Sequence, residues 1–471
     1  MAHHYSNLQL EDNLKKIKQT INAEVPTYLK TTAGYSTKNC YRRRKPAYKV
    51  LNCSVKLLDQ FKLGFHAASV MYEAEINLED NENQNVHFVL VKTMPANAMI
   101  RSIMNSADQF FNESKIYSEM VPLLLQTCAA PSYEDMKAER SSSNLTAAYD
   151  LFPKCYYVSS DPEKGMIMLQ DLRKLGYKIG GDEMMLMDYE HIVVALEGLA
   201  RFHAMSYAMK KKDLRKYEEY IVTQIRDARR FMKKQATLES MDEGYSRFLR
   251  YSTMLLLDKF EEMQLNEGGL YTEKINRLME RIDNISELMS ELLSPDEPLA
   301  VLCHGDFNRN NMLFRYDSNN RPSGVKFFDF QNPYYASPTI DLSFFMFVNA
   351  SPELWATCWD DIFSTYHRNL LDAISEFLNC PQEALHPEFS LEAFKHQFSK
   401  YCLYGFMLAT SFIIGQAAHP DRVKAFDMFS DGVPSMEEMD SLTKENVELA
   451  RDEVIDRVLS LTQELLNKIS L

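Results

Sequence analysis

Polar residues of the types that bind divalent cations and move protons gather near residue 300 of this chain. The segment from His304 to Asn311 reads HGDFNRNN, so that four residues separate Asp306 from Asn311. A strand-like apolar run then leads directly into Asp329. Transfer of a phosphoryl group needs a carboxylate that orients the acceptor hydroxyl and takes its proton, and hard oxygen ligands for Mg²⁺. Asp306, Asn311 and Asp329 have the residue types and the order that this chemistry requires.

A lysine and a glutamate in the first quarter of the chain could complete such a site. Lys92 ends the strand-like run FVLVK, and a lysine can neutralise part of the charge of a polyphosphate. Glu113 lies in the helical pattern that follows and could pair with Lys92. Glu119 on the same helix is the alternative partner. The run resembles the Val-Ala-Ile-Lys strand of kinases.

The elements around Lys92 are mainly strands. Runs rich in β-branched, aromatic and aliphatic residues occupy positions 55–61, 69–76 and 87–92. After Pro95 the apolar spacing becomes helical, and Pro122 follows this pattern. Another strand is predicted at 165–169. The order is therefore β-β-β-α-β-β if one more strand precedes Gly165, and the first 35 or so residues add an amphipathic helical segment.

The rest of the sequence is mainly helical. Helical periodicity extends over the segments 191–209, 217–267 and 271–293. The exception is 300–330, where short apolar strands flank the polar loops that carry Asp306 and Asn311. The apolar run 401–418 contains Gly, Ser, Thr and Gln and lacks a flanking basic cluster, which favours a buried core helix over a membrane span.

Composition restricts the class of partner and the compartment. The chain has 471 residues and a net charge of −14, which argues against nucleic acid as the main partner, because phosphate backbones need basic tracks. The eight cysteines are scattered and form no Cys-x-x-Cys pair, as in a reduced cytosolic protein. No apolar signal segment follows Met1. We therefore expect a cytoplasmic protein without a membrane span.

Several motifs together resemble the ecdysteroid kinase-like (CHK kinase-like) family, from about residue 52 to about residue 415. Two of them, HGD-x4-N and DFQ, are specific for the wider kinase-like superfamily that includes choline kinases and aminoglycoside phosphotransferases. Two more favour this family over its relatives: FNESKIY at 111–117 and LARFHA at 199–204. SPTIDL at 337–342 is also part of the resemblance. The family is typical of insects, and its reference reaction is ATP-dependent phosphorylation of ecdysteroid hydroxyls.

The resemblance implies a role for each candidate residue. Asp306 would be the catalytic base, and Asn311 and Asp329 would bind magnesium. Lys92 would contact the phosphates of ATP, with Glu113 as its partner. The expected acceptor is a hydroxyl group of a small molecule, such as a steroid or xenobiotic alcohol.

The resemblance also implies an α+β, two-lobed, protein-kinase-like fold. Its parts would be an N-terminal helical extension at 1–44, a small β-rich N-lobe at 45–168 and a large, mainly helical C-lobe at 169–471. ATP would lie in the cleft between the lobes.

Three features depart from protein kinases. Gly305 replaces their catalytic-loop arginine, so the switch that reads a phosphorylated loop is not expected. The metal-binding triplet ends in Gln331 instead of glycine. The loop expected over the phosphates, 63–69, contains Gly64 alone where kinases have three glycines.

Two alternatives stay open at this point. The acceptor could be choline, ethanolamine or another alcohol, or the chain could be a non-catalytic pseudokinase that binds a small molecule or protein. Three further polar residues are interpreted as structural. His203 is expected to be a core histidine, His304 to fix the catalytic loop, and Asp341 to lie near the first turn of a helix.

Overall fold

The computed structural model describes most of the chain. The described residues are 7–32, 48–58, 69–80, 83–95, 97–103, 105–129, 150–182, 184–227, 239–266, 269–385, 387–417, 437–438, 441, 444–445, 448 and 450–469. Gly64 and most of the loop expected to cover the phosphates lie outside them, as does Ala418 at the end of the apolar run.

The chain divides into two compact units. The first comprises Met1–Lys178, Glu218–Ala228 and Lys326–Gln331. The second comprises Ile179–Tyr217, Arg229–Val325 and Asn332–Leu471. The boundaries expected from the sequence, at 44/45 and 168/169, stay a prediction.

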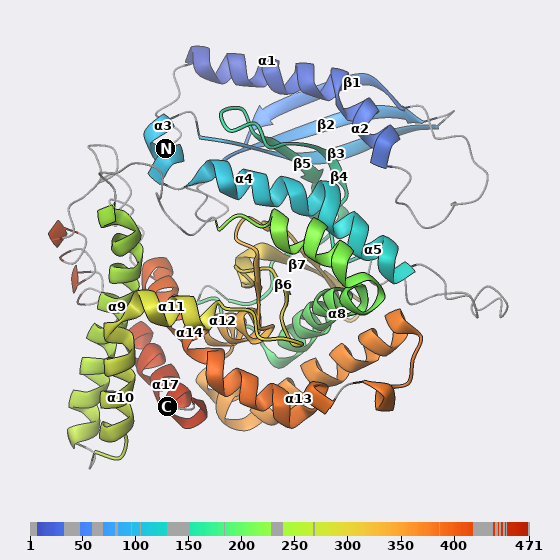
Figure 1. Cartoon of the computed structure of the whole chain (residues 1–471). Coiled ribbons are helices and arrows are strands. Elements are labelled where there is room, and N and C mark those ends of the chain that lie inside the picture. Colours follow the sequence, from blue (N-terminus) through green and yellow to red (C-terminus); the bar gives the residue numbers. More distant parts are fainter. Residues whose placement is uncertain are drawn as a thin grey trace. The chain divides into compact units, whose positions relative to one another are not determined.

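The first unit contains a five-stranded antiparallel sheet with the strand order β1-β2-β3-β5-β4 (Figure 1). Its strands are β1 (Tyr48–Leu57), β2 (Val70–Asp80), β3 (Asn83–Thr93), β4 (Cys155–Ser159) and β5 (Met166–Gln170). Three consecutive strands are found around Lys92, although β1 begins at Tyr48 and not at the predicted position 55, and β4 is the extra strand expected before Gly165. Lys92 lies opposite Met71 on β2 and Ile167 on β5.

One face of this sheet is covered by α1 (Asn7–Ala23) and α2 (Val25–Thr32) (Figure 1). Apolar residues of α1 recur at helical spacing, and Ile17 and Ile21 are buried against the sheet. Alternate residues of β3, among them Val89 and Val91, face this core. Because successive side chains of a strand point to opposite faces, Lys92 points to the other side of the sheet.

A nearly continuous helical segment lies on that other side. It consists of α3 (Ala98–Ile103), α4 (Ser106–Lys115), a π-helical turn (Ile116–Met120) and α5 (Val121–Ala129). Pro122 is the second residue of α5 and lies just after the π turn, within this helical segment.

The second unit is mainly helical. Its helices are α8 (Tyr189–Tyr220), α9 (Glu239–Asn266), α10 (Thr272–Asp283), α11 (Ile285–Leu292), α12 (Thr339–Asn349), α13 (Pro352–Leu378), α14 (Leu391–Ala417) and α17 (Asp452–Lys468). A break in α8 occurs at Asp213, whose backbone is not helical. Two short pairings complete the unit: β6 (Val301–Cys303) with β9 (Tyr334–Ala336), and β7 (Met312–Tyr316) with β8 (Pro322–Phe327). The expected α+β class is confirmed.

The core of the second unit is built around α12 and α14. Every residue of α12 is buried, and the part of α14 from Tyr401 to Thr410 is buried as well. Gly405 allows close packing, because a Cβ atom there would lie 2.3 Å from the Ser343 hydroxyl oxygen and 2.4 Å from the Phe344 nitrogen. The apolar run is therefore a core helix as far as it is described. Among the described residues, no helix combines the length and apolar character needed to cross a bilayer.

Candidate active site

In the first unit, one buried ammonium group lies between two carboxylates. The Nζ atom of Lys92 is 2.7 Å from Oε2 of Glu113 and 2.5 Å from Oδ1 of Asp329. The Glu113 side chain is 2% exposed, while those of Lys92 and Asp329 are 11% and 15% exposed. Burial on this scale strengthens the electrostatic interactions, so the three groups hold each other in place. A ligand can therefore reach Lys92 and Asp329 but not Glu113.

The same contacts decide which glutamate partners Lys92. Glu113 is buried on the inner side of α4, whereas Glu119 is exposed and pairs with Lys115 at 2.7 Å. The structure therefore brings Glu113, and not Glu119, to Lys92.

Competition for one ammonium group changes the pKa values of this cluster. Burial opposes the charge on Lys92, but Asp329 and Glu113 outweigh it and raise the Lys92 pKa. Burial raises the pKa of Glu113, and Lys92 opposes that rise while Asp329 adds to it. Lys92 therefore stays cationic at neutral pH.

The segment that carries Asp329 is fixed within the first unit. Lys326 donates to the backbone oxygens of Asp150 at 2.7 Å and Phe152 at 3.2 Å, and Phe327 N–H donates to Leu151 O at 2.8 Å. Asp329 itself has a left-handed backbone, with φ at 67°, which costs energy for a residue other than glycine. Such strain is held by the surrounding structure and is common at functional sites.

Phe330, the residue after Asp329, anchors this turn by packing against other aromatic rings. Phe330 is fully buried and packs edge-on against Tyr117 of the π turn, with ring centroids 5.9 Å apart. It also packs on Phe152 at 5.8 Å. Asn112 of α4 donates to Gln331 O at 3.3 Å. The DFQ triplet is therefore fastened to the helix that carries Glu113.

In the second unit, the segment after β6 presents the Asp306 carboxylate between two amides. Asn308 Nδ2 donates to Oδ1 of Asp306 at 3.0 Å, and Asn311 Nδ2 donates to Oδ2 at 3.0 Å. Asn311 also donates to the Asp306 backbone oxygen at 2.8 Å. Asn308 accepts from Asn310 N–H at 2.9 Å and thereby begins the short 3-10 helix Arg309–Asn311. Because the Asn311 nitrogen faces Asp306, its amide oxygen is the atom suited to bind a cation.

Gly305 lets the chain turn sharply before Asp306. Its φ is 77°, and a Cβ atom there would lie 1.6 Å from the backbone oxygen of Asn332. No other residue fits without moving the Asn332 segment. The replacement of the kinase arginine therefore has a steric reason in this chain.

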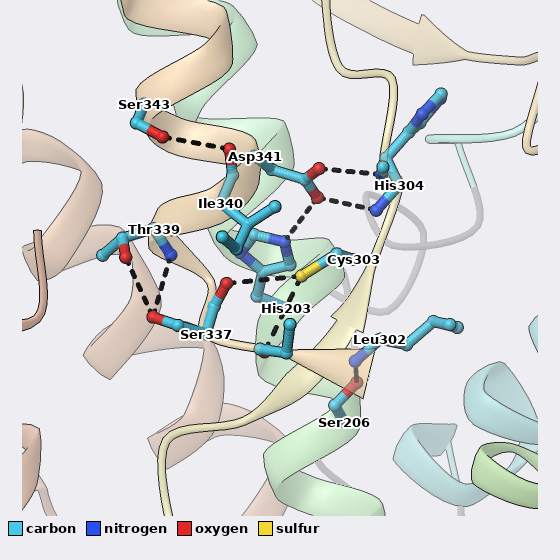
Figure 2. A network of polar contacts seen from close by, with 12 residues as sticks. His203, Ser206, Leu302, Cys303, His304, Ser337, Thr339, Ile340, Asp341 and Ser343 are labelled. Carbon is cyan, nitrogen blue, oxygen red and sulfur yellow. Dashed lines mark hydrogen bonds and ion pairs between the residues drawn. The ribbon is translucent and has the colours of Figure 1, made fainter. Parts of the chain in front are cut away.

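Asp341, in the first turn of α12, holds this loop through the backbone. Its carboxylate accepts from His304 N–H at 2.6 Å and from Gly305 N–H at 2.8 Å (Figure 2). His203 of α8 lies 3.2 Å from Asp341 Oδ2 through Nε2 and 2.8 Å from the Tyr366 hydroxyl through Nδ1. The expected structural roles of His203 and Asp341 agree with these contacts, and His203 is a fully buried, hydrogen-bonded core histidine.

The same network contains a set of atoms that could suggest a metal site. The ligand atoms of His203, Cys303 and Asp341 all lie within 4.8 Å of one another. However, Cys303 Sγ donates to Ser337 O at 3.4 Å and to Ala336 O at 3.7 Å, and burial raises the pKa of the thiol. A metal needs the thiolate, so these contacts favour a neutral thiol and a structural network.

The five predicted site residues thus form two groups. Lys92, Glu113 and Asp329 meet in the first unit, and Asp306 and Asn311 meet in the second. The sequence analysis did not single out Asn308, although an asparagine two residues after Asp306 is a recognisable signal for a capped turn. The interaction of Asp341 with the loop backbone has no local sequence signal.

Comparisons with known proteins show which family the chain belongs to. It is similar to the solved structure of a mutant aminoglycoside 2'-phosphotransferase IIIa in complex with GDP. The identity is 13%, with 90% of this chain and 97% of that chain covered and a TM-score of 0.32. A comparison with curated protein sequences finds no significant match. The profile of the ecdysteroid kinase-like family matches residues 64–378, which is more than half of the chain. The chain therefore belongs to the ecdysteroid kinase-like family and is a kinase-like phosphotransferase of small molecules.

Proposed function

We propose that the protein transfers the γ-phosphoryl group of ATP to a hydroxyl group of an ecdysteroid or a similar small alcohol. The observation that carries this proposal is the contact of Lys92 with both Glu113 and Asp329. A cation held by a buried carboxylate, next to a second and more accessible carboxylate, is what binding of a metal-bound polyphosphate requires. Family membership supports the same chemistry.

Each residue has a task in this proposal. Lys92 binds phosphate oxygens, and Glu113 keeps the ammonium group in position. Asp306 orients the acceptor hydroxyl and takes its proton as the new phosphate ester forms. The amides of Asn308 and Asn311 fix both carboxylate oxygens of Asp306, which reduces the reorganisation needed at the moment of transfer.

The donor set also fits a magnesium ion. Asp329 offers a carboxylate with partial access to solvent, and Asn311 offers an amide oxygen, both of which are hard ligands. When bound, the ion would neutralise charge on the β- and γ-phosphates. We propose that Asn311 and Asp329 act as its protein ligands.

The acceptor is proposed from the family alone. Ecdysteroid is the substrate that the family name gives, and a steroid or xenobiotic alcohol has the hydroxyl that the chemistry needs. A choline- or ethanolamine-type acceptor would use the same residues for phosphoryl transfer. The cytoplasmic location expected from the sequence stays a prediction.

Calorimetric titration with ATP and Mg²⁺ tests the nucleotide site. We expect Lys92→Met to weaken binding at least about tenfold, because the variant removes a desolvated cation from the phosphate site. Lys56→Met is the matched control. Lys56 also lies on the sheet and pairs with a glutamate, but its side chain is 75% exposed. Equal affinities of the Lys92 variant, the control and the wild type would refute the proposed role of Lys92.

The pseudokinase alternative is tested with the same protein. Wild-type protein is incubated with ATP, Mg²⁺ and a panel of steroids and plant-derived alcohols, and mass spectrometry detects acceptors that have gained a phosphoryl group. A phosphorylated product supports the kinase proposal. Tight binding of ATP without product from any acceptor would support a binding protein without catalysis.

A further inference from the structure

A polar cavity of about 180 Å³ lies in the first unit, away from Asp329 and Glu113. It is enclosed by α1, the end of β3, α3 and the turn before β5. Its polar lining comprises Asn13, Lys16, Thr93, Arg101, Glu163 and Lys164. Three of these side chains are cationic, and one is anionic.

Lys16 and Lys164 are the two ammonium groups of this cavity. Within the described part of the chain, neither Lys16 nor Lys164 forms an ion pair. Burial lowers the pKa of Lys16, and the charge of Lys164 lowers it further, while Asp161 opposes this effect. Two ammonium groups that repel each other beside a cavity favour an anion between them.

Two acids, Asp161 and Glu163, compensate the lysines in part. Asp161 does not line the cavity, and its Oδ1 atom accepts from the backbone N–H groups of Glu163 at 2.9 Å and Lys164 at 2.7 Å. Glu163 is exposed. Arg101 is oriented by its bond to Pro95 O at 2.9 Å. The lining carries more positive than negative side chains, although the net charge of the chain is −14.

We propose that this cavity binds a phosphate group, either as inorganic phosphate or as part of a small phosphate monoester. The site is separate from the proposed nucleotide site and goes beyond the proposed function. Three donors around a cavity of this size suit a tetrahedral dianion, because lysine and arginine are the side chains that bind phosphate.

The position of the cavity couples it to Lys92. Thr93, Met94 and Pro95, which line it, directly follow Lys92 on the chain. At the floor, a Cβ atom on Gly165 would lie 2.7 Å from Met94 Cε and 2.9 Å from Phe110 Cδ1. The Phe110 ring in turn lies 5.7 Å from Lys92 Nζ. A bound phosphate group therefore fixes the strand end that positions Lys92.

Calorimetric titration of the full chain tests this site with two probes, inorganic phosphate and glycerol phosphate. The double variant Lys16→Glu/Lys164→Glu replaces attraction by repulsion, so we expect at least about tenfold weaker binding of both probes. The matched control is Lys15→Glu/Lys18→Glu, which makes the same charge change on exposed positions of α1. Circular dichroism checks that all proteins are folded.

The outcomes are distinct. Binding that the cavity variant weakens and the control leaves unchanged supports the site. Tighter binding of glycerol phosphate identifies a monoester site, and equal or tighter binding of inorganic phosphate identifies a site for the free ion. No binding of either probe, equal binding by the cavity variant and the wild type, or an equal loss in the control would overturn the proposal. Repeating the titration with ATP present separates this site from the nucleotide site, because ATP that displaces either probe would also overturn it.

Discussion

The substitution Asp341→Asn should loosen the loop that carries Asp306 while leaving the rest of the protein folded. The carboxylate of Asp341 accepts from two backbone N–H groups, of His304 at 2.6 Å and of Gly305 at 2.8 Å. Asparagine keeps one oxygen and turns an NH₂ group toward one of these donors. One charge-assisted hydrogen bond is lost, which leaves one buried N–H without its acceptor.

The size of this effect follows from the loss of that one bond. A hydrogen bond to a charged group contributes about 1.5–3 kcal/mol, and the buried donor left without a partner puts the loss toward the upper end of this range. We therefore expect local opening of the loop to become easier by about 3 kcal/mol, which corresponds to roughly 100-fold faster exchange of its amide hydrogens.

Hydrogen–deuterium exchange of the peptide that spans His304 to Asn311, followed by mass spectrometry, measures this change without knowledge of the acceptor. Asp360→Asn is the control, because that carboxylate is 82% exposed on α13 and forms a surface ion pair. If the loop amides of Asp341→Asn exchange as slowly as those of wild type and control, Asp341 does not hold the loop.

Three further predictions concern single residues. Glu113→Gln should weaken binding of ATP with Mg²⁺ about tenfold by calorimetry, because it removes the buried partner charge of Lys92, whereas Glu119→Gln should bind as wild type does. Gly305→Ala should lower the melting temperature in scanning calorimetry far more than Gly176→Ala does. Both glycines have positive φ, but a Cβ atom meets the Asn332 oxygen only at position 305. Equal losses in the two variants would contradict the steric argument. Burial lowers the pKa of His367 below its usual value of 6.5, although its bond to Phe389 O opposes this shift. Below pH 6.5 the unfolded chain takes up a proton at His367 that the folded chain does not. The free energy of unfolding therefore decreases as the pH falls below 6.5. His367→Gln should make the denaturation midpoint less sensitive to acid, and an unchanged pH profile would refute this assignment.

Residues that act through short sequence separations could be predicted from the sequence. Asp306 and Asn311 are five positions apart on one loop, and their contact follows from that spacing. Lys92 lies on a strand and Glu113 on α4 of the helical segment that follows it, so their pairing could be expected once the strand was recognised. In both cases the local pattern determines the geometry.

Contacts that depend on packing between distant elements had no comparable signal. Asp341 reaches the backbone of His304 and Gly305, and a backbone donor leaves no trace in the identity of its residue. His203 lies 163 positions from its partner Tyr366, on a different helix. The coverage of the sheet by α1 and α2 likewise depends on tertiary packing, although the amphipathic pattern of α1 was visible.

The most direct test of the account is phosphoryl transfer by Asp306→Asn compared with wild type, measured by mass spectrometry on an acceptor that the wild type phosphorylates. The account predicts that the variant loses transfer while its affinity for ATP with Mg²⁺ stays within about twofold of wild type, because Asp306 acts on the acceptor hydroxyl. Transfer by the variant at the wild-type rate would contradict the account.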